Sequence, residues 1–202
     1  RSGVVSRMVN KNNKKKDPTS IKVLGYVCDS KGEILNTTKH PLVVPQLTEK
    51  KSRRAKMIVF VGTSMNSGKS FAATATVKTL TQLGYNVRAT KITGTASLKD
   101  VLSMSDAGAE KFSDFTFLGH PSTYMLDKST ILDIYNKLDL KYANKPSNYW
   151  VVELADGIVQ RETAMLLSSP EFKDRIHKIV FCAGDALGAI GGKRLLKDKY
   201  GI

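Results

Sequence analysis

Apolar residues lie in short continuous runs along most of this chain, and these runs alternate with segments of helical spacing. Such runs are typical of strands buried on both faces, as in a parallel sheet. The alternation predicts an α/β fold whose parallel sheet carries helices on both faces. The predicted strands are 57–61, 86–92, 115–118, 149–154 and 178–183, and the predicted helices are 71–83, 98–111, 129–138, 160–168, 171–176 and 191–200.

The residues before this pattern are organised differently. Residues 1–17 are polar and basic and are expected to be disordered, and 49–56 is expected to be a charged linker. Between them, 18–48 is predicted to form a small β module that precedes the α/β domain at 57–202. Its predicted strands, two of them joined by a turn at 29–32, cover 21–28, 33–35 and 40–45.

The segment between the first strand and the first helix predicts a phosphate-binding loop (P-loop). Backbone N–H groups there would converge on an anion at the helix N-terminus, Lys69 would reach the terminal phosphates, and the Ser70 hydroxyl would bind Mg²⁺. The usual first glycine position holds Thr63, and the glycine comes one residue earlier. A Gly/Ser-rich turn with a solvated lysine is the alternative, which the flanking strand and helix disfavour. The predicted nucleotide-binding residues are Gly62, Thr63, Ser64, Met65, Asn66, Ser67, Gly68, Lys69 and Ser70.

Polar residues also follow the other predicted strands, where ligands of open parallel sheets bind. Glu153 is the best magnesium candidate, because four apolar residues place it at a strand end. For each acid, and for Asp100 above all, a helix cap or a surface charge remains an alternative. The residues at or near these strand ends are Lys91, Asp100, Asp106, Glu153, Asp156 and Asp185.

Five segments, in order, resemble the dethiobiotin synthetase family of the SIMIBI class of P-loop proteins. They are the loop at 62–70, the Lys-Ile-Thr-Gly at 91–94, the Ser-Asp-Ala at 105–107, the strand end at 152–157 and the Leu-Gly-Ala-Ile-Gly at 187–191. The resemblance implies that Lys69 and Lys91 face phosphate or substrate, and that Ser70, Asp106 and Glu153 surround Mg²⁺.

Departures from that family argue against dethiobiotin synthesis itself. Leu154 and Asp156 interrupt its glycine-rich acid loop, and Gly191 stands where it has Asn. The family also continues beyond the equivalent of Ile202, so this domain is expected to be truncated. Within 156–163, Arg161 is either an anion clamp or part of a capped surface helix, and His120 is either a general base or a turn histidine.

The composition limits which partners and which cellular compartment are expected for the protein. The net charge of +14 over 202 residues comes largely from lysine-rich runs at 11–16 and 50–56. Such runs bind nucleic acid or form solvated linkers, and the absence of interleaved aromatic residues favours linkers. No apolar run is long enough to span a membrane, and no signal peptide is evident. Cys28 and Cys182 are expected to be reduced core thiols in a cytoplasmic protein, and no zinc site is expected.

The functional hypothesis is a Mg-ATP enzyme, a ligase, synthetase or kinase that activates a small acid by phosphoryl transfer. Lys69, Lys91 and Glu153 would be its catalytic residues. The alternative is a regulatory or assembly NTPase that controls a protein partner, and either protein is expected to act as a dimer. A nucleic-acid-associated ATPase is a third, less favoured hypothesis. GTP has no positive support, because the base-reading motif Asn-Lys-x-Asp is absent.

Overall fold

A parallel β-sheet forms the centre of the α/β fold, as the sequence predicts. The structure, a computed structural model, describes residues 5, 7–11, 13, 16–45 and 49–202. Within these residues the sheet has five strands in the order β3-β2-β4-β1-β5, and every neighbouring pair is parallel. The strands are β1 (Lys56–Gly62), β2 (Asn86–Lys91), β3 (Lys111–Asp114), β4 (Asn148–Glu153) and β5 (Ile176–Cys182).

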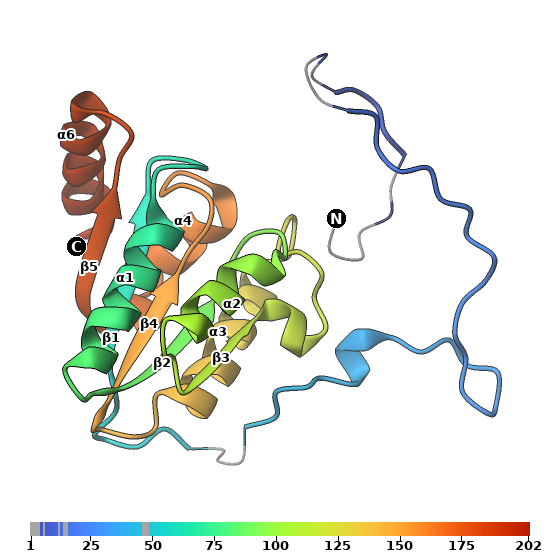
Figure 1. The fold of residues 1–202 in the computed structure, drawn as a ribbon, viewed down its shortest axis with the longest axis horizontal. Helices are drawn as coiled ribbons and strands as arrows, with labels where there is room; N and C mark the ends of the chain where they lie inside the picture. The colour runs from blue at the N-terminus through green and yellow to red at the C-terminus, as the bar shows by residue number, and fades with distance from the viewer. Residues whose placement is uncertain (1–4, 6, 12, 14–15, 46–48) are drawn as a thin grey trace.

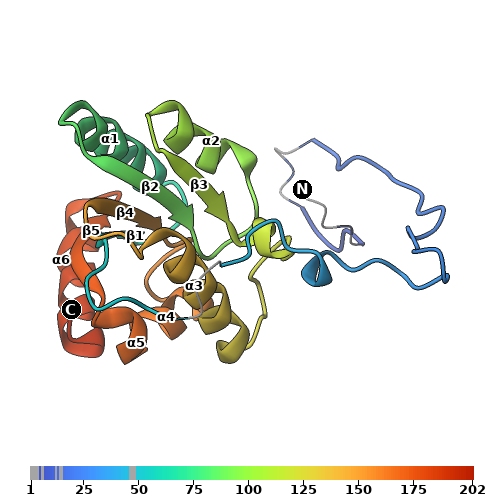
Figure 2. The same cartoon turned by 90° about the horizontal axis from the view of Figure 1, so that it is seen from below.

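Helices cover both faces of this sheet (Figures 1 and 2). One face carries α1 (Lys69–Gln82) and α2 (Leu98–Asp106), and the other carries α3 (Lys128–Tyr142), α4 (Arg161–Leu167), α5 (Pro170–Lys173) and α6 (Ala186–Leu195). Alternate residues of β1 enter two separate cores, with Val59 on the α3 side and Phe60 on the α1 side. A strand in this position must be apolar at every residue, which explains the continuous runs in the sequence.

Three predicted elements near the sheet differ in the structure. The predicted strand at 115–118 is wrong: β3 lies just before it, and Phe115–Leu118 form a 3₁₀-helix capped by the side chain of Asp114. The final helix starts earlier than predicted, at Ala186, because Asp185 caps it. The strand predicted as buried at 178–183 is β5, which lies at the edge of the sheet and leaves His177 and Lys178 exposed.

The expected cysteine environments are wrong in part. Both thiols are free, but Cys28 is exposed and lies in no strand. Cys182 is half-buried at the end of β5, where burial raises the pKa of its thiol. Its place beside the loop after β1, rather than in the core, follows from the edge position of β5.

The three strands predicted for the β module are absent from its described residues. A single antiparallel bridge joins Cys28 and Ile34 across a turn that the Asp29 carboxylate stabilises, and the neighbouring side chains are exposed. A two-stranded unit without a packed face is not stable, which accounts for the difference. Further along, the N–H groups of Leu42 and Val43 donate to the Phe117 carbonyl, at 2.7 Å and 3.1 Å. Residues 46–48 of the predicted module, and 1–4, 6, 12 and 14–15 of the basic segment, lie outside the described residues.

Part of the segment predicted as a charged linker packs against α3, although Lys51, Ser52 and Arg53 are exposed. The N–H of Ala55 donates to the Ala143 carbonyl at 2.7 Å, and Arg54 pairs with Asp139, whose side chain is fully buried. Lys50 also lies 3.5 Å from that carboxylate. A buried acid on α3 therefore holds part of the basic run, which the sequence pattern alone did not indicate. No helix in the described part of the chain has the length and apolar character that crossing a bilayer requires.

Candidate functional site

The loop between β1 and α1 has the backbone shape of an anion cradle. Gly68 caps α1 with φ of 98°, and Asn66 adopts φ of 62°, both in the left-handed region. Such turns direct consecutive backbone N–H groups toward one side, and the N-terminus of α1 adds the positive end of its dipole. The residues after β1 therefore offer a binding site for a negatively charged group.

The position of the first glycine has a steric cause. A Cβ atom at Gly62 would lie 2.2 Å from the Ser67 hydroxyl oxygen and 2.9 Å from the Cys182 carbonyl oxygen. The next residue, Thr63, donates its N–H to that same carbonyl at 3.0 Å and so continues the contact with β5. The loop closes on itself at Gly62, and a side chain is tolerated one residue later.

Lys69 lies inside the loop rather than in solvent. Its ammonium group donates to the Ser64 carbonyl at 2.8 Å and lies 3.5 Å from the Ser67 hydroxyl. The residue is 5% exposed, and burial lowers the pKa of its amine although Glu153 and Asp156 oppose this change. The loop thus holds a partly desolvated cation whose charged form an anion would stabilise.

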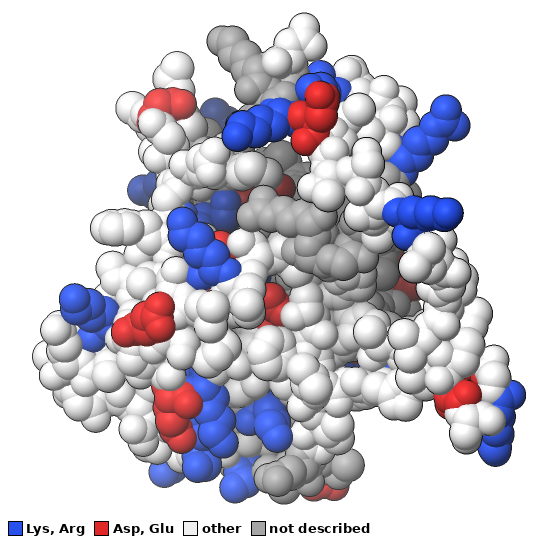
Figure 3. Space-filling view, turned by 45° about the vertical axis from the view of Figure 1, so that its right-hand side comes forward, with Lys and Arg blue, Asp and Glu red and all other residues white. Residues whose placement is uncertain are grey.

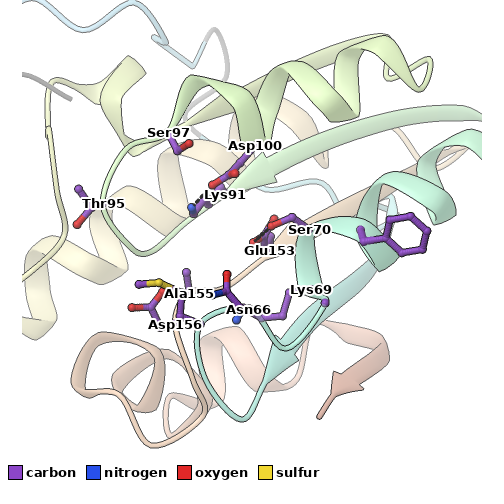
Figure 4. Close-up of a pocket in the computed structure, with 13 residues that line it drawn as sticks. Asn66, Lys69, Ser70, Lys91, Thr95, Ser97, Asp100, Glu153, Ala155 and Asp156 are labelled. Carbon is purple, nitrogen blue, oxygen red and sulfur yellow. Dashed lines mark hydrogen bonds and ion pairs between the residues drawn. The ribbon is translucent and has the colours of Figure 1, made fainter. Parts of the chain in front are cut away.

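Glu153 and Ser70 meet at the floor of the cleft (Figure 4). The Ser70 hydroxyl donates to Glu153 Oε1 at 2.8 Å. The second oxygen, Oε2, is buried without a hydrogen-bond partner in the described part of the chain. Burial raises the pKa of this carboxyl, while Lys91 acts in the opposite direction. A buried carboxylate oxygen without a protein partner can accept a hydrogen bond or bind a cation.

Lys91 ends β2 directly beside Glu153, its register partner on β4. Its ammonium group lies 2.5 Å from Asp100 Oδ2, and its side chain is 6% exposed. Gly94 follows with φ of 122°, and a Cβ atom there would lie 3.3 Å from the Lys91 side chain. Two lysines and three carboxylates therefore line one cleft, and Figure 4 labels all of them: Lys69, Lys91, Asp100, Glu153 and Asp156.

The predicted position of Asp106 is wrong. Asp106 is the last residue of α2, is exposed, and does not line the cleft. Asp100, in the first turn of α2, lines it instead. The helix rises about 1.5 Å per residue, so six residues separate the two carboxylates by roughly 9 Å along its axis.

The cleft has a volume of about 420 Å³, enough for a small ligand such as a nucleotide polyphosphate. Phe71, Thr95 and Ser97 also line the cleft, which the sequence pattern did not indicate. Phe71 is exposed, and its position in the predicted helix 71–83 gave no sign of this role. Of the loop residues, Met65, Asn66, Gly68, Lys69 and Ser70 line the cleft, while Gly62, Thr63, Ser64 and Ser67 lie outside its lining. The other lining residues are Lys91, Asp100, Glu153, Ala155 and Asp156.

Of the remaining candidates, Arg161 and Asp185 make structural contacts. Gln160 caps α4, and Arg161 pairs with the neighbouring Glu162 at 2.9 Å and donates to the Leu126 carbonyl, which fits the capped-helix alternative. Asp185 caps α6. His120 does not line the cleft, and burial together with Lys137 lowers the pKa of its imidazole.

The described residues contain no group of three or more His, Cys, Asp and Glu side chains placed to hold a metal ion. This does not conflict with magnesium at a phosphate site. Mg²⁺ commonly takes one or two protein ligands there and fills its remaining positions with phosphate oxygens and water.

Comparison of the chain with protein-family models gives no match, and comparison with curated proteins gives none either. Among solved structures, it is similar to the signal recognition particle receptor FtsY from Elizabethkingia anophelis in complex with GDP, at 10% identity and a TM-score of 0.42. The match covers 72% of this chain and 45% of that one.

A likeness with a TM-score this low supports no conclusion about the chain. The α/β fold rests on the chain's own parallel sheet, the helices on both of its faces and the loop between β1 and α1. The roles of individual residues rest on the geometry of this chain.

Proposed function

We propose that this chain binds a nucleoside triphosphate together with Mg²⁺ in the cleft, with ATP as the first candidate. The observation that carries the proposal is the pair formed by Ser70 and Glu153 beside Lys69. The hydroxyl and the carboxylate are within hydrogen-bond distance, and the remaining carboxylate oxygen has no described partner. A cation between these oxygens and a phosphate would satisfy that oxygen.

Ser70 and Glu153 would hold the magnesium ion, since both offer the hard oxygen ligands that it prefers. When bound, the ion supplies positive charge that stabilises the phosphate oxygens and orients them. Asp100 forms an ion pair with Lys91 and would keep the ammonium group of that lysine in place.

The loop and the two lysines would bind the polyphosphate and stabilise its negative charge. Backbone N–H groups of the loop would orient the polyphosphate, and Lys69 would leave the Ser64 carbonyl to contact it. Lys91 would offset negative charge that develops as a phosphoryl group moves. The proposed reaction class follows from the resemblance to dethiobiotin synthetases: the protein would be a ligase, synthetase or kinase that acts on a small acid. Thr95, Ser97 and Asp156 would line the part of the cleft that binds this second substrate.

A regulatory NTPase is the second candidate, because the surface beside the loop offers a place for a protein partner. β5 is an edge strand, and Leu187 and Ile190 of α6 are 83% and 68% exposed. Nucleotide-dependent self-association, measured by light scattering without added substrate, would favour this candidate. Turnover that rises only when a small carboxylic acid is added would favour the enzyme.

Calorimetric titration with ATP and with GTP, each with and without Mg²⁺, tests the proposal. Binding that requires Mg²⁺ and shows one site per chain would support it. Failure of both nucleotides to bind at millimolar concentration would overturn it.

Replacing Glu153 with glutamine should stabilise the free protein yet remove the magnesium dependence of nucleotide binding. Burial raises the folded-state pKa of Glu153 above its ordinary value of 4.5. The stability that this group contributes is therefore complete below about pH 4.5 and is lost as the pH rises through the folded-state pKa. At pH 7 the neutral amide avoids the cost of a buried charge, and we expect about 1 kcal/mol of added stability.

Thermal melts of the wild-type protein and Glu153→Gln at pH 4 and pH 7 check this expectation. The difference should be several degrees at pH 7 and should shrink at pH 4, where the wild-type carboxyl is protonated. A destabilised variant at pH 7 would contradict it, as would unchanged magnesium dependence.

Replacing Asp100 with asparagine should strengthen binding of metal-free pyrophosphate by about 3- to 10-fold, because it removes a negative charge from the cleft and frees Lys91. Asp106→Asn is the matched control, since it makes the same change on the same helix outside the cleft. It should alter the affinity less than about twofold, because exposed charges at that distance are screened. Titration in the presence of a chelator measures both, and equal effects would argue against the placement of Asp100.

A further inference from the structure

A second pocket lies at the opposite end of the sheet, where the strands begin, and we propose that it binds a small phosphate-bearing anion. It has a volume of about 250 Å³. Arg88 of β2 and its register partner Lys111 of β3 form one side, and the end of α3 forms the other. Because Lys91 and Glu153 end their strands, this pocket is separate from the cleft, and the inference does not rest on the proposed function. Its lining residues are Lys51, Arg88, Lys111, Leu140, Lys141, Asn144 and Lys145.

Arg88 is the centre of this pocket. It is 4% exposed, yet its contacts are long: one terminal nitrogen lies 3.5 Å from the carbonyl oxygens of Lys141 and Tyr142, and the other lies 3.7 Å from Glu110. Its Nε is buried without a hydrogen-bond partner among the described residues. A guanidinium has five donors, and burying it with contacts at the limit of hydrogen bonding is costly. An anion in the pocket would supply the missing acceptors.

The other cations of the pocket are also uncompensated. Lys51, Lys111, Lys141 and Lys145 form no ion pair with a described carboxylate, and Lys141 donates only to the Val44 carbonyl, at 3.2 Å. Glu110 is the one described acid within ion-pair distance of the five cations. Figure 3 shows lysine and arginine side chains gathered along the lower edge of the molecule, the end at which the strands begin in Figure 1.

The shape and lining of the pocket favour a compact phosphate over a polynucleotide. The buried arginine can be reached only by a group that enters the pocket, and its planar fork matches two phosphate oxygens. Among the described residues, no aromatic side chain lines the pocket to stack a base. A purely structural role for Arg88, holding the carbonyls that end α3, would not require four lysines to line the same pocket.

Titration of the Lys69→Ala variant with inorganic pyrophosphate, without metal and followed by amide NMR shifts, tests the inference. The substitution weakens the loop site, and the positions of the shifted amides tell the two sites apart. We expect saturable shifts around Arg88, Lys111 and Lys145. Adding the substitutions Lys111→Gln and Lys145→Gln, both at exposed residues, should weaken this binding at least about tenfold.

The matched control adds Lys78→Gln and Lys193→Gln, which remove the same charge from exposed positions on α1 and α6. It should leave the affinity within about twofold. Equal weakening by both pairs would overturn the inference, because it would show a non-specific response to net charge. Absence of shifts around Arg88 would also overturn it, as would shifts there with an oligonucleotide but not with pyrophosphate. Nucleotide binding in the cleft of the wild-type protein is a separate measurement, so either proposal can fail alone.

Discussion

Replacing Lys69 with alanine is expected to weaken Mg-ATP binding by about 10- to 100-fold and to slow any turnover further. A charge-assisted hydrogen bond contributes about 1.5–3 kcal/mol, which corresponds to that range of affinity. The effect should be this large because Lys69 is 5% exposed and held by the loop, so its contact with phosphate would be desolvated and oriented in advance. Calorimetry on the two proteins measures the change.

Lys78→Ala is the control for this experiment. Lys78 is exposed on the same helix, so its loss changes the net charge equally without touching the loop. The affinity of Lys78→Ala for Mg-ATP should stay within about twofold of the wild-type value. Equal affinities of Lys69→Ala and Lys78→Ala would contradict a phosphate-binding role for the loop.

The depressed pKa of Lys69 adds a pH dependence to this prediction. Burial lowers the pKa of the free amine, whereas a bound phosphate would favour its charged form. The nucleotide should therefore bind with proton uptake that grows as the pH rises toward the lowered pKa, and affinity should fall above it. Titrations in buffers of different ionisation enthalpy measure the uptake, which should disappear in Lys69→Ala.

The central strands and the loop were predictable because they depend on the residues within each segment and not on contacts with distant parts of the chain. The apolar run at 57–61 is too short for a typical helix and is followed by turn residues, which favours a strand covered on both sides, and a small-residue loop ending in Gly-Lys-Ser marks the start of α1. Glu153 was predictable for the same reason: the apolar residues before it place it at the end of β4. The α/β fold and the nearness of Lys69, Ser70 and Glu153 followed from these signals.

The errors arose where the outcome depends on packing between distant segments. Residues 105–107 resemble a magnesium motif, but only the orientation of α2 decides that Asp100, and not Asp106, lies at the cleft. Residues 21–28 have strand composition, yet the described structure provides no face for them to pack against. The linker at 49–56 looked solvated because the acid that holds it lies on α3, more than 80 residues away.

Asp139 is the acid on α3 that holds the basic segment, and replacing it with alanine should destabilise the protein by about 3 kcal/mol. The carboxylate is fully buried and lies against Arg54, Lys50 and Arg175. Removing one partner of a buried ion pair leaves the others uncompensated, which typically costs about 3–5 kcal/mol. The lower end applies here, because the side chains of Arg54, Arg175 and Lys50 remain 13%, 19% and 28% exposed.

Chemical denaturation of Asp139→Ala and Asp133→Ala separates this cluster from an ordinary surface pair. Asp133 lies on the same helix and pairs with Lys137 at 2.7 Å, but both side chains are about half exposed, so its loss should cost less than about 0.5 kcal/mol. Similar midpoints for the two variants would show that the basic segment does not depend on Asp139. A large loss confined to Asp139→Ala would show that the buried carboxylate and its partners, Lys50 and Arg54 of the basic segment together with Arg175, stabilise the α/β domain.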